Sequence, residues 1–160
     1  AKLKMSKPEY IYIDSERIRI HKDSEKIIKI IAGKFGDTEG PVKGHNVEPI
    51  YFDVELEKNK EFNFELPSKH NTFIYLIKGE IKVGDKDHNK VRNSTLILLA
   101  NGNKLKVKGI IKSKFLLISG KPIGEPVARG GPFVMNTKEE ILQAVEDYQN
   151  GEFVQNDKSN

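Results

Sequence analysis

Apolar and polar residues alternate along most of the chain between Ile11 and Ser119. A period of two places successive side chains on opposite faces, which predicts β-strands with one buried face. The alternating runs occupy residues 11–13, 18–20, 27–31, 50–56, 61–66, 73–77, 80–83, 95–99, 104–108 and 114–118. Turn residues separate these runs, and no interval is long enough for a crossover helix. The pattern therefore favours an antiparallel barrel or a two-sheet sandwich over a parallel α/β fold.

One helix is predicted close to the C-terminus. Asn136 or Thr137 can cap it, and Glu139 or Glu140, three residues further on, completes a capping box. Gly151 tolerates the left-handed conformation with which many helices end. The apolar face of the predicted helix is formed by Ile141, Leu142, Val145 and Tyr148. A single apolar stripe indicates a helix that lies on a surface rather than inside a core.

Composition and charge exclude several classes of protein. The chain has 160 residues, 37% hydrophobic and 31% charged, as expected for one globular domain. It contains no cysteine, which excludes disulfides, thiolate zinc sites, iron–sulfur clusters and cysteine nucleophiles. The net charge of +4 comes from interspersed residues of both signs without an aromatic and basic binding motif, so direct nucleic-acid binding is not expected.

No feature of the sequence indicates a membrane or a secretory route. The longest apolar runs, at 95–100 and 115–118, are far shorter than the roughly 20 residues of a membrane span. The chain does not open with a basic, apolar and small-residue signal. We expect a cytoplasmic protein, or a nuclear one if the source is eukaryotic.

The most specific motif lies between the last predicted strand and the helix. Residues 120–141 read GKPIGEPVARGGPFVMNTKEEI, and residues 143–149 continue with QAVEDYQ. Two earlier segments agree with it: FIYLIKGE at 73–80, and IAGKFG at 31–36 followed by GPV at 40–42. Together these motifs resemble the C-terminal half of the pirin family, whose members are bicupins with two β-barrels in one longer chain. The resemblance extends over nearly the whole chain.

The resemblance implies an all-β, cupin-type antiparallel β-barrel (a double-stranded β-helix or jelly roll) with one C-terminal α-helix. The opening Ala1–Met5, followed by Pro8, resembles the linker between the two pirin barrels, so the chain is similar to the second barrel alone. We expect five parts: a linker or strap at 1–10, the cupin barrel at 11–120, an extended apolar segment rich in Gly and Pro at 121–135, the helix at 136–151 and a tail at 152–160.

The metal-binding positions of a cupin carry other residue types in this chain. In a cupin a His-x-His pair, an acidic residue and a later ligand converge inside the barrel, and the resemblance places these ligands, with iron, in the first barrel. Counted from the turn at Gly79, the corresponding positions are Glu65, Pro67, Asn71 or Thr72, and Leu105. A non-haem iron site needs roughly two histidines and a carboxylate. We therefore expect no metal and no catalytic residue in this chain, and iron in the missing N-terminal barrel.

Two of the four histidines are weak candidates for lining a pocket. His70 lies near the expected ligand positions but out of register with them, and is interpreted as a hydrogen-bonded turn residue. His45 lies in a loop and can face a pocket or an opposing barrel. His21 and His88 lie in charged stretches and are expected to be exposed. Because no two histidines stand at a spacing of two or four, a two-histidine metal clamp on one element is excluded.

Charged residues mark the predicted solvent sides of two strands. Lys104, Lys106 and Lys108 alternate with apolar residues, and their common face is interpreted as the wet side of a half-buried strand. An anion-binding stripe is the alternative. Asp53 and Glu55 likewise share one strand face, which is expected to meet water.

Residues 128–135 form the candidate interface. Glycines and a proline disfavour regular structure there, yet the segment contains side chains too apolar to be left in water. The candidate interface residues are Arg129, Pro132, Phe133, Val134 and Met135. We expect them to pack against the N-terminal cupin barrel, and the alternative is packing against the barrel of this chain.

The resemblance leaves two functional classes open. In the first, the parent protein is an iron-dependent quercetin 2,3-dioxygenase, and this metal-free half supplies a wall or lid for the pocket of the other barrel. In the alternative, the parent is a non-catalytic binding module that regulates transcription factors or metabolic enzymes. In both, the N-terminal cupin domain is the expected partner, a further protein partner is possible in the second, and the domain alone is expected to be inert.

Overall fold

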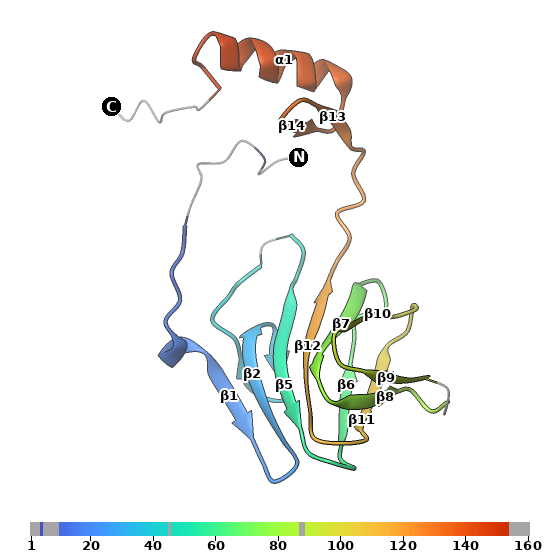
Figure 1. The fold of residues 1–160 in the computed structure, drawn as a ribbon. Helices are drawn as coiled ribbons and strands as arrows, with labels where there is room; N and C mark the ends of the chain where they lie inside the picture. The colour runs from blue at the N-terminus through green and yellow to red at the C-terminus, as the bar shows by residue number, and fades with distance from the viewer. Residues whose placement is uncertain (1–3, 5–9, 45, 87–88, 154–160) are drawn as a thin grey trace. The chain divides into compact units, whose positions relative to one another are not determined.

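The computed structural model describes residue 4 and residues 10–44, 46–86 and 89–153 of the chain. The chain divides into two compact units. The barrel unit comprises residues 13–123, and the terminal unit combines residues 1–12 with residues 124–160. Figure 1 shows the strands of the barrel unit and the helix of the terminal unit.

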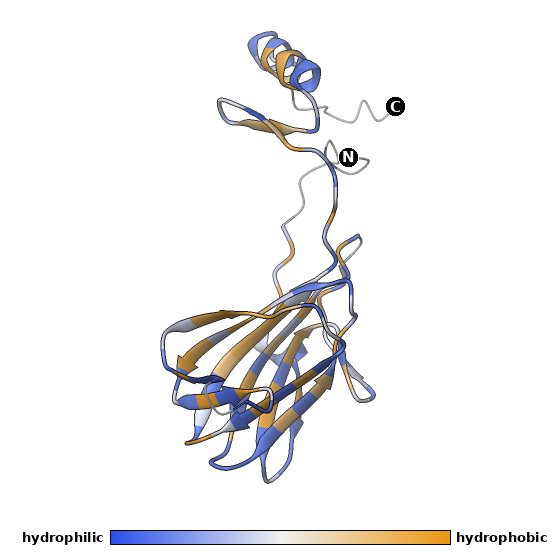
Figure 2. Ribbon diagram, turned by 90° about the vertical axis from the view of Figure 1, so that its right-hand side faces the viewer, coloured by the Kyte–Doolittle hydropathy of each residue, from blue (hydrophilic) through white to orange (hydrophobic). Residues whose placement is uncertain are grey.

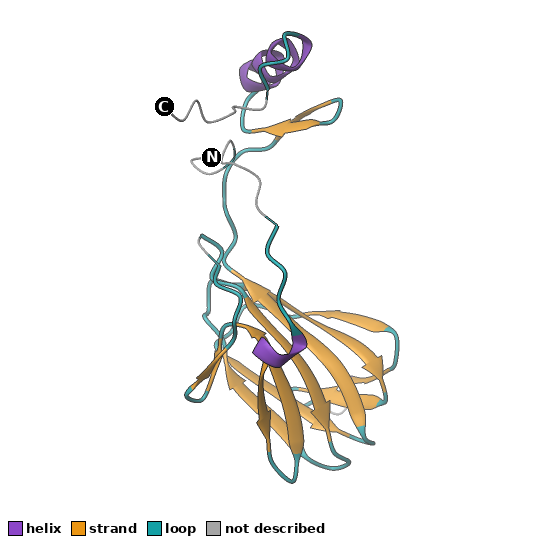
Figure 3. Cartoon of the chain, turned by 90° about the vertical axis from the view of Figure 1, so that its left-hand side faces the viewer, coloured by secondary structure: helices purple, strands orange, loops and turns teal. Residues whose placement is uncertain are grey.

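Strands build the barrel unit, after one short 3-10 turn at its start (Figure 3). Its elements in chain order are η1 (Ser15–Arg17), β1 (Arg19–Lys22), β2 (Lys26–Ala32), β3 (Lys34–Phe35), β4 (Thr38–Glu39), β5 (Ile50–Leu56), β6 (Glu61–Glu65), β7 (Asn71–Lys78), β8 (Glu80–Val83), β9 (Lys90–Arg92), β10 (Thr95–Leu98), β11 (Lys104–Gly109) and β12 (Ser113–Gly120).

Two antiparallel sheets contain most of these strands. The six-stranded sheet has the order β1-β2-β5-β12-β7-β10, and the four-stranded sheet has the order β6-β11-β8-β9. From β5 onward the chain passes repeatedly from one sheet to the other, so that strands adjacent in sequence are mostly not adjacent in space. This alternation is typical of a jelly roll. The predicted all-β fold with one C-terminal helix is confirmed for the described residues.

The hydrophobic core of the barrel unit lies between the two sheets. Along β5 every second residue is buried, with Phe52 and Val54 fully inaccessible to solvent. The same alternation on β12 buries Phe115 and Leu117. Orange and blue segments alternate along the strands in Figure 2, which displays this pattern. The period of two read from the sequence thus determines which side of each strand faces the core.

Two segments differ from the sequence prediction. Residues 11–13 belong to no strand, and the side chains of Ile11 and Tyr12 are 65% and 73% exposed. Residues 90–92, which lie between two of the predicted runs and belong to neither, form β9, and β9 pairs with β8 at the edge of the four-stranded sheet. An edge strand tolerates polar residues because one of its sides is open to water.

Gly79 connects β7 of the six-stranded sheet to β8 of the four-stranded sheet. Its φ is +103°, a conformation that other residues rarely adopt. A Cβ at this position would overlap Ser113 Oγ and lie 2.7 Å from the carbonyl oxygen of Lys112. Ser113 Oγ accepts a hydrogen bond from the backbone N–H of Glu80 at 3.2 Å. The glycine therefore allows the chain to cross between sheets where β12 begins.

The terminal unit contains a hairpin and a helix. The strands are β13 (Ala128–Gly130) and β14 (Phe133–Met135), and the helix is α1 (Lys138–Gln149). The segment predicted to lack regular structure thus forms a short hairpin, with Gly131 at its turn in the left-handed region. Thr137 is the N-cap: its Oγ1 accepts the N–H of Glu140 at 3.2 Å, and the carboxylate of Glu140 accepts the N–H of Thr137 at 3.1 Å.

Close approach of helix and hairpin fixes which face of α1 is covered. Ala144 is buried, and a Cβ on Gly130 would overlap Cγ2 of Ile141. The covered face is therefore centred on Ala144, whereas Leu142 and Tyr148 are 71% and 67% exposed. Of the four residues predicted to form one apolar face, these two mostly contact solvent. No helix in the described part of the chain has the length and apolar character needed to cross a membrane.

We expect Phe52→Ala to lower the free energy of unfolding by about 3–5 kcal/mol, because it empties a fully buried site in the core. Urea denaturation followed by circular dichroism measures this loss. Ile111→Ala is the matched control, since Ile111 is 47% exposed and its truncation should change stability by about 0.5 kcal/mol or less. Equal losses in the two variants would contradict the assignment of the core.

Candidate functional site

The positions expected to carry cupin metal ligands differ in their surroundings in this structure. Leu105 is part of the hydrophobic core. Thr72 is buried, and its Oγ1 lies 2.7 Å from Oγ of Ser119. Glu65 is exposed at the end of β6. Among the described residues no group of three or more histidines and carboxylates could hold a metal ion. The residues present therefore do not fit an iron site.

Phenyl rings occupy the space between the sheets. Phe35 stacks on Phe62 and Phe64, with ring centroids 5.9 and 6.0 Å apart. Phe52 meets Phe64 edge-on at 5.1 Å, and Phe115 meets Phe62 in the same way at 5.7 Å. Such offset and edge-to-face contacts fill a core without leaving polar groups inside it.

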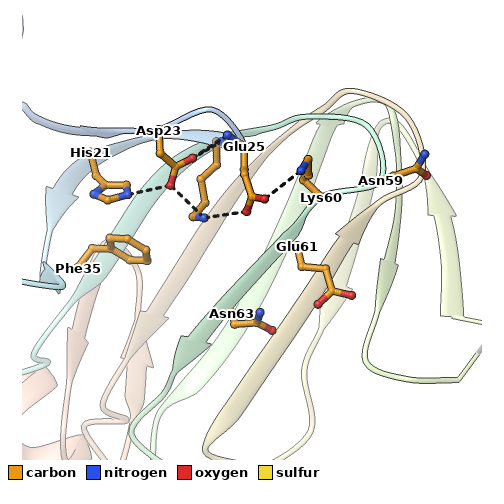
Figure 4. A pocket seen from close by; sticks show the side chains of 9 residues that line it. His21, Asp23, Glu25, Phe35, Asn59, Lys60, Glu61 and Asn63 are labelled. Carbon is orange, nitrogen blue, oxygen red and sulfur yellow. Dashed lines mark hydrogen bonds and ion pairs between the residues drawn. The ribbon is translucent and has the colours of Figure 1, made fainter.

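A pocket of about 640 Å³ lies beside this ring cluster, between the turn that joins β1 to β2 and the start of β6 (Figure 4). Its lining residues are His21, Asp23, Glu25, Lys26, Phe35, Asn59, Lys60, Glu61 and Asn63. Phe35 is the apolar member, and the His21 ring lies 5.0 Å from the ring of Phe35. The remaining lining side chains are polar or charged, so the pocket is a hydrated depression over the edge of the core.

A chain of hydrogen bonds and ion pairs, here called the Asp23 network, organises this pocket. Asp23 accepts the backbone N–H groups of Glu25 and Lys26 at 2.7 and 2.9 Å. Its carboxylate also lies 3.2 Å from Nζ of Lys26 and 3.3 Å from Nε2 of His21. Glu25 continues the network to Nζ of Lys60 at 3.0 Å. Figure 4 shows these contacts as dashed lines between successive side chains.

The electrostatics of the Asp23 network indicate a structural connection rather than a catalytic group. The backbone N–H of Glu25, followed by that of Lys26 and the side chains of Lys26 and His21, holds the pKa of Asp23 well below its ordinary value. A carboxylate whose pKa is lowered is a weak base near neutral pH and is poorly matched to general acid–base chemistry. Because Glu25 and Lys60 come from different turns, the network ties the β1–β2 turn to the start of β6.

His70 lines a second pocket, of about 270 Å³. It is 7% exposed, and its backbone N–H donates to the carbonyl oxygen of Pro67 at 3.0 Å, as expected for a turn residue. Its Nδ1 lies 3.3 Å from Oγ of Ser119, and its Nε2 lies 3.9 Å from a carboxylate oxygen of Glu48. Sequence reasoning missed Ser119 and Glu48, because both lie far from His70 along the chain and no motif links them to it. His45 and His88 lie outside the described residues.

The candidate interface residues divide into two groups within the terminal unit. Phe133 is half-buried, with its ring 5.9 Å from that of Tyr148 and 5.1 Å from that of Phe153. Met135 is also half-buried. Val134 is 44% exposed, and the remaining two members, Arg129 and Pro132, are exposed as well.

We expect the stability contributed by the Asp23 carboxylate to be fully present above its ordinary pKa of 3.8 and to be lost as the pH falls towards its lower pKa in the folded state. Asp23→Asn keeps an acceptor for the two N–H groups but cannot ionise, so its stability should fall less between pH 6 and pH 2 than that of the wild type. Urea denaturation across this range measures the difference. Asp37→Asn, which removes a fully exposed carboxylate from another turn, is the control; a pH dependence of Asp23→Asn identical to the wild type would refute the network.

Comparison with known proteins agrees with the fold described above. Residues 51–154 match the pirin C-terminal cupin domain. Over 155 residues the chain is 34% identical to a pirin-like protein of Caulobacter vibrioides, covering 96% of this chain and 55% of that protein. It is 33% identical to human pirin over 150 residues, covering 92% of this chain and 51% of that protein.

A solved structure extends the likeness to three dimensions. The crystal structure of quercetin 2,3-dioxygenase from Acinetobacter baumannii matches with a TM-score of 0.74 and 29% identity, over 91% of this chain and 50% of that one. The chain spans about half the length of the curated relatives it matches. The match over residues 51–154, more than half of the sequence, shows that the chain belongs to the pirin family and contains its C-terminal cupin domain.

Proposed function

We propose that this domain is the metal-free structural half of a two-barrel pirin protein whose N-terminal barrel binds iron and carries the chemistry. The observation that carries the proposal is the filled interior of the barrel unit. Phe35, Phe52 and Phe64 are in ring contact there, and Leu105 replaces a ligand position. A buried metal site in the same volume would need charged groups with hydrogen-bonded partners, which an interior of phenyl rings does not provide.

The substrate class that we propose for the complete protein is that named for a relative. The matching structure from A. baumannii is named a quercetin 2,3-dioxygenase. In the proposed protein, a flavonol such as quercetin is oxidised in the N-terminal barrel, and this domain supplies a rigid wall or lid of that pocket. A rigid, well-packed neighbour holds the groups of a binding site in place better than a loop does.

The terminal unit provides contacts with the N-terminal barrel in this proposal. Because Phe133 and Met135 pack partly within the unit, the exposed members Arg129, Pro132 and Val134 are the ones available to a partner. Leu142 and Tyr148 of α1 add exposed apolar surface to the same unit.

The test is the size, metal content and activity of the native polypeptide, captured from its source cells with an antibody against this domain. We expect a mass of about twice 18.2 kDa, one bound iron per polypeptide and loss of the quercetin absorbance band in its presence. The 160-residue chain alone, as the control, should bind no iron and leave quercetin unchanged. A native polypeptide of 18.2 kDa, or turnover of quercetin by the isolated chain, would overturn the proposal.

A further inference from the structure

The outer faces of the two sheets differ sharply in chemistry. On the four-stranded sheet, the described residues that point away from the core are Glu61, Asn63, Glu65, Glu80, Lys82, Lys90, Arg92, Lys104, Lys106 and Lys108. This is the polar face that an antiparallel sheet presents to water. It agrees with the interpretation of the three lysines of β11 as the wet side of a half-buried strand.

The six-stranded sheet presents a contiguous apolar surface instead, which we call the apolar face. It consists of Tyr51, Phe73, Tyr75, Ile77, Leu96, Leu98, Leu116 and Ile118. These side chains point outward, because each alternates along its strand with residues that are buried or packed on the core, such as Phe52, Ile74 and Leu117. Leu98 is 77% exposed and Leu96 is 55% exposed.

The strand register makes the apolar face continuous. Leu98 lies opposite Phe73, Phe73 lies opposite Ile118, and Ile118 lies opposite Tyr51. This row crosses four neighbouring strands, β10, β7, β12 and β5, without a charged residue. In the next row Leu96 lies opposite Tyr75, and Tyr75 lies opposite Leu116. Directly opposed side chains on one sheet face are in contact distance, so the two rows form one patch.

Ion pairs mark one border of the apolar face. Nζ of Lys114 lies 3.3 Å from a carboxylate oxygen of Asp53 and 3.4 Å from one of Glu55. Asp53 stands opposite Leu116, next to the second apolar row. An aromatic and aliphatic centre with charges at its rim is the typical composition of a protein–protein interface. A solvated sheet face would not require leucines and tyrosines in this arrangement.

We infer that the apolar face is the docking surface for the other cupin barrel of the same polypeptide. This inference rests on the proposed function, and names the surface through which the two halves meet. The chain spans 55% and 51% of the lengths of two relatives, and its family match is to a C-terminal domain, so a further region of similar size precedes it in those relatives. A standard interface covers about 800 Å² on each partner, for which eight apolar side chains on four strands provide the centre.

Hydroxyl-radical footprinting read by mass spectrometry tests the inference. The 160-residue chain and the native polypeptide captured with the antibody are exposed to the same radical dose. We expect Tyr75, Leu96 and Leu98 to be labelled several-fold less in the native polypeptide than in the isolated chain. Ile111, an exposed apolar residue in the turn between β11 and β12, serves as the internal control and should be labelled equally in both.

A pair of matched variants adds a second readout. Leu96→Lys with Leu98→Lys places two charges on exposed positions of the apolar face, and should leave the melting temperature of the isolated chain unchanged. In the native polypeptide the same changes should restore the labelling of Tyr75 to that of the isolated chain. Asn63→Lys, on the outer face of the four-stranded sheet, adds a charge away from the apolar face and should change neither readout.

The outcomes separate this inference from the proposed function. A native polypeptide of 18.2 kDa overturns the proposed function. A polypeptide of twice that size in which Tyr75, Leu96 and Leu98 are labelled as in the isolated chain overturns the docking surface alone. Protection of the face through dimerisation of the isolated chain, shown by analytical ultracentrifugation and abolished by the double lysine variant, assigns it to a second copy and also overturns the inference.

Discussion

Contacts among phenylalanine rings between the two sheets hold the barrel unit together. Phe35, from the small β3–β4 hairpin, touches Phe52 of the six-stranded sheet and Phe62 and Phe64 of the four-stranded sheet, so one side chain links three elements. Burying an aromatic side chain contributes on the order of 2–3 kcal/mol, and the interior of a barrel is limited in volume. Space that holds rings cannot also hold imidazoles and carboxylates with their hydrogen-bond partners. The ring cluster therefore joins the two sheets and fills space that polar metal ligands would otherwise need.

The sequence predicted those features that depend on neighbouring residues. Alternation located the long strands, and the capping box at Thr137 located the start of the helix. Features that depend on which distant segments meet were not predicted. Thr72 reaches Ser119 because β7 pairs with β12, and Glu25 reaches Lys60 because the β1–β2 and β5–β6 turns lie close together. The hairpin at β13 and β14 was missed for a related reason, since its strands are short and are supported by α1 rather than by alternation.

The sequence pattern did not predict the apolar face either. Two of its strands nevertheless contain the longest apolar runs of the sequence, 95–100 and 115–118. A strand that is apolar on both sides loses its alternation and reads as a plain hydrophobic run. In the structure these runs become β10 and β12, whose inward residues fill the core while Leu96, Leu98 and Leu116 point outward. A continuous apolar run in an antiparallel sheet thus indicates a strand with an apolar outer face, and the strand register shows which residues form that face.

A covalent link between two domains lowers the affinity that their contact surfaces need in order to stay bound. Two domains joined by a short flexible linker meet at an effective concentration in the millimolar range, so a face that docks within one chain needs little intrinsic affinity. The outer face of the four-stranded sheet is charged instead. Its interspersed lysines and glutamates keep that side hydrated and disfavour pairing with other molecules. One sheet of the barrel unit thus carries an apolar outer face and the other a charged one, while the phenyl rings between them join the two sheets.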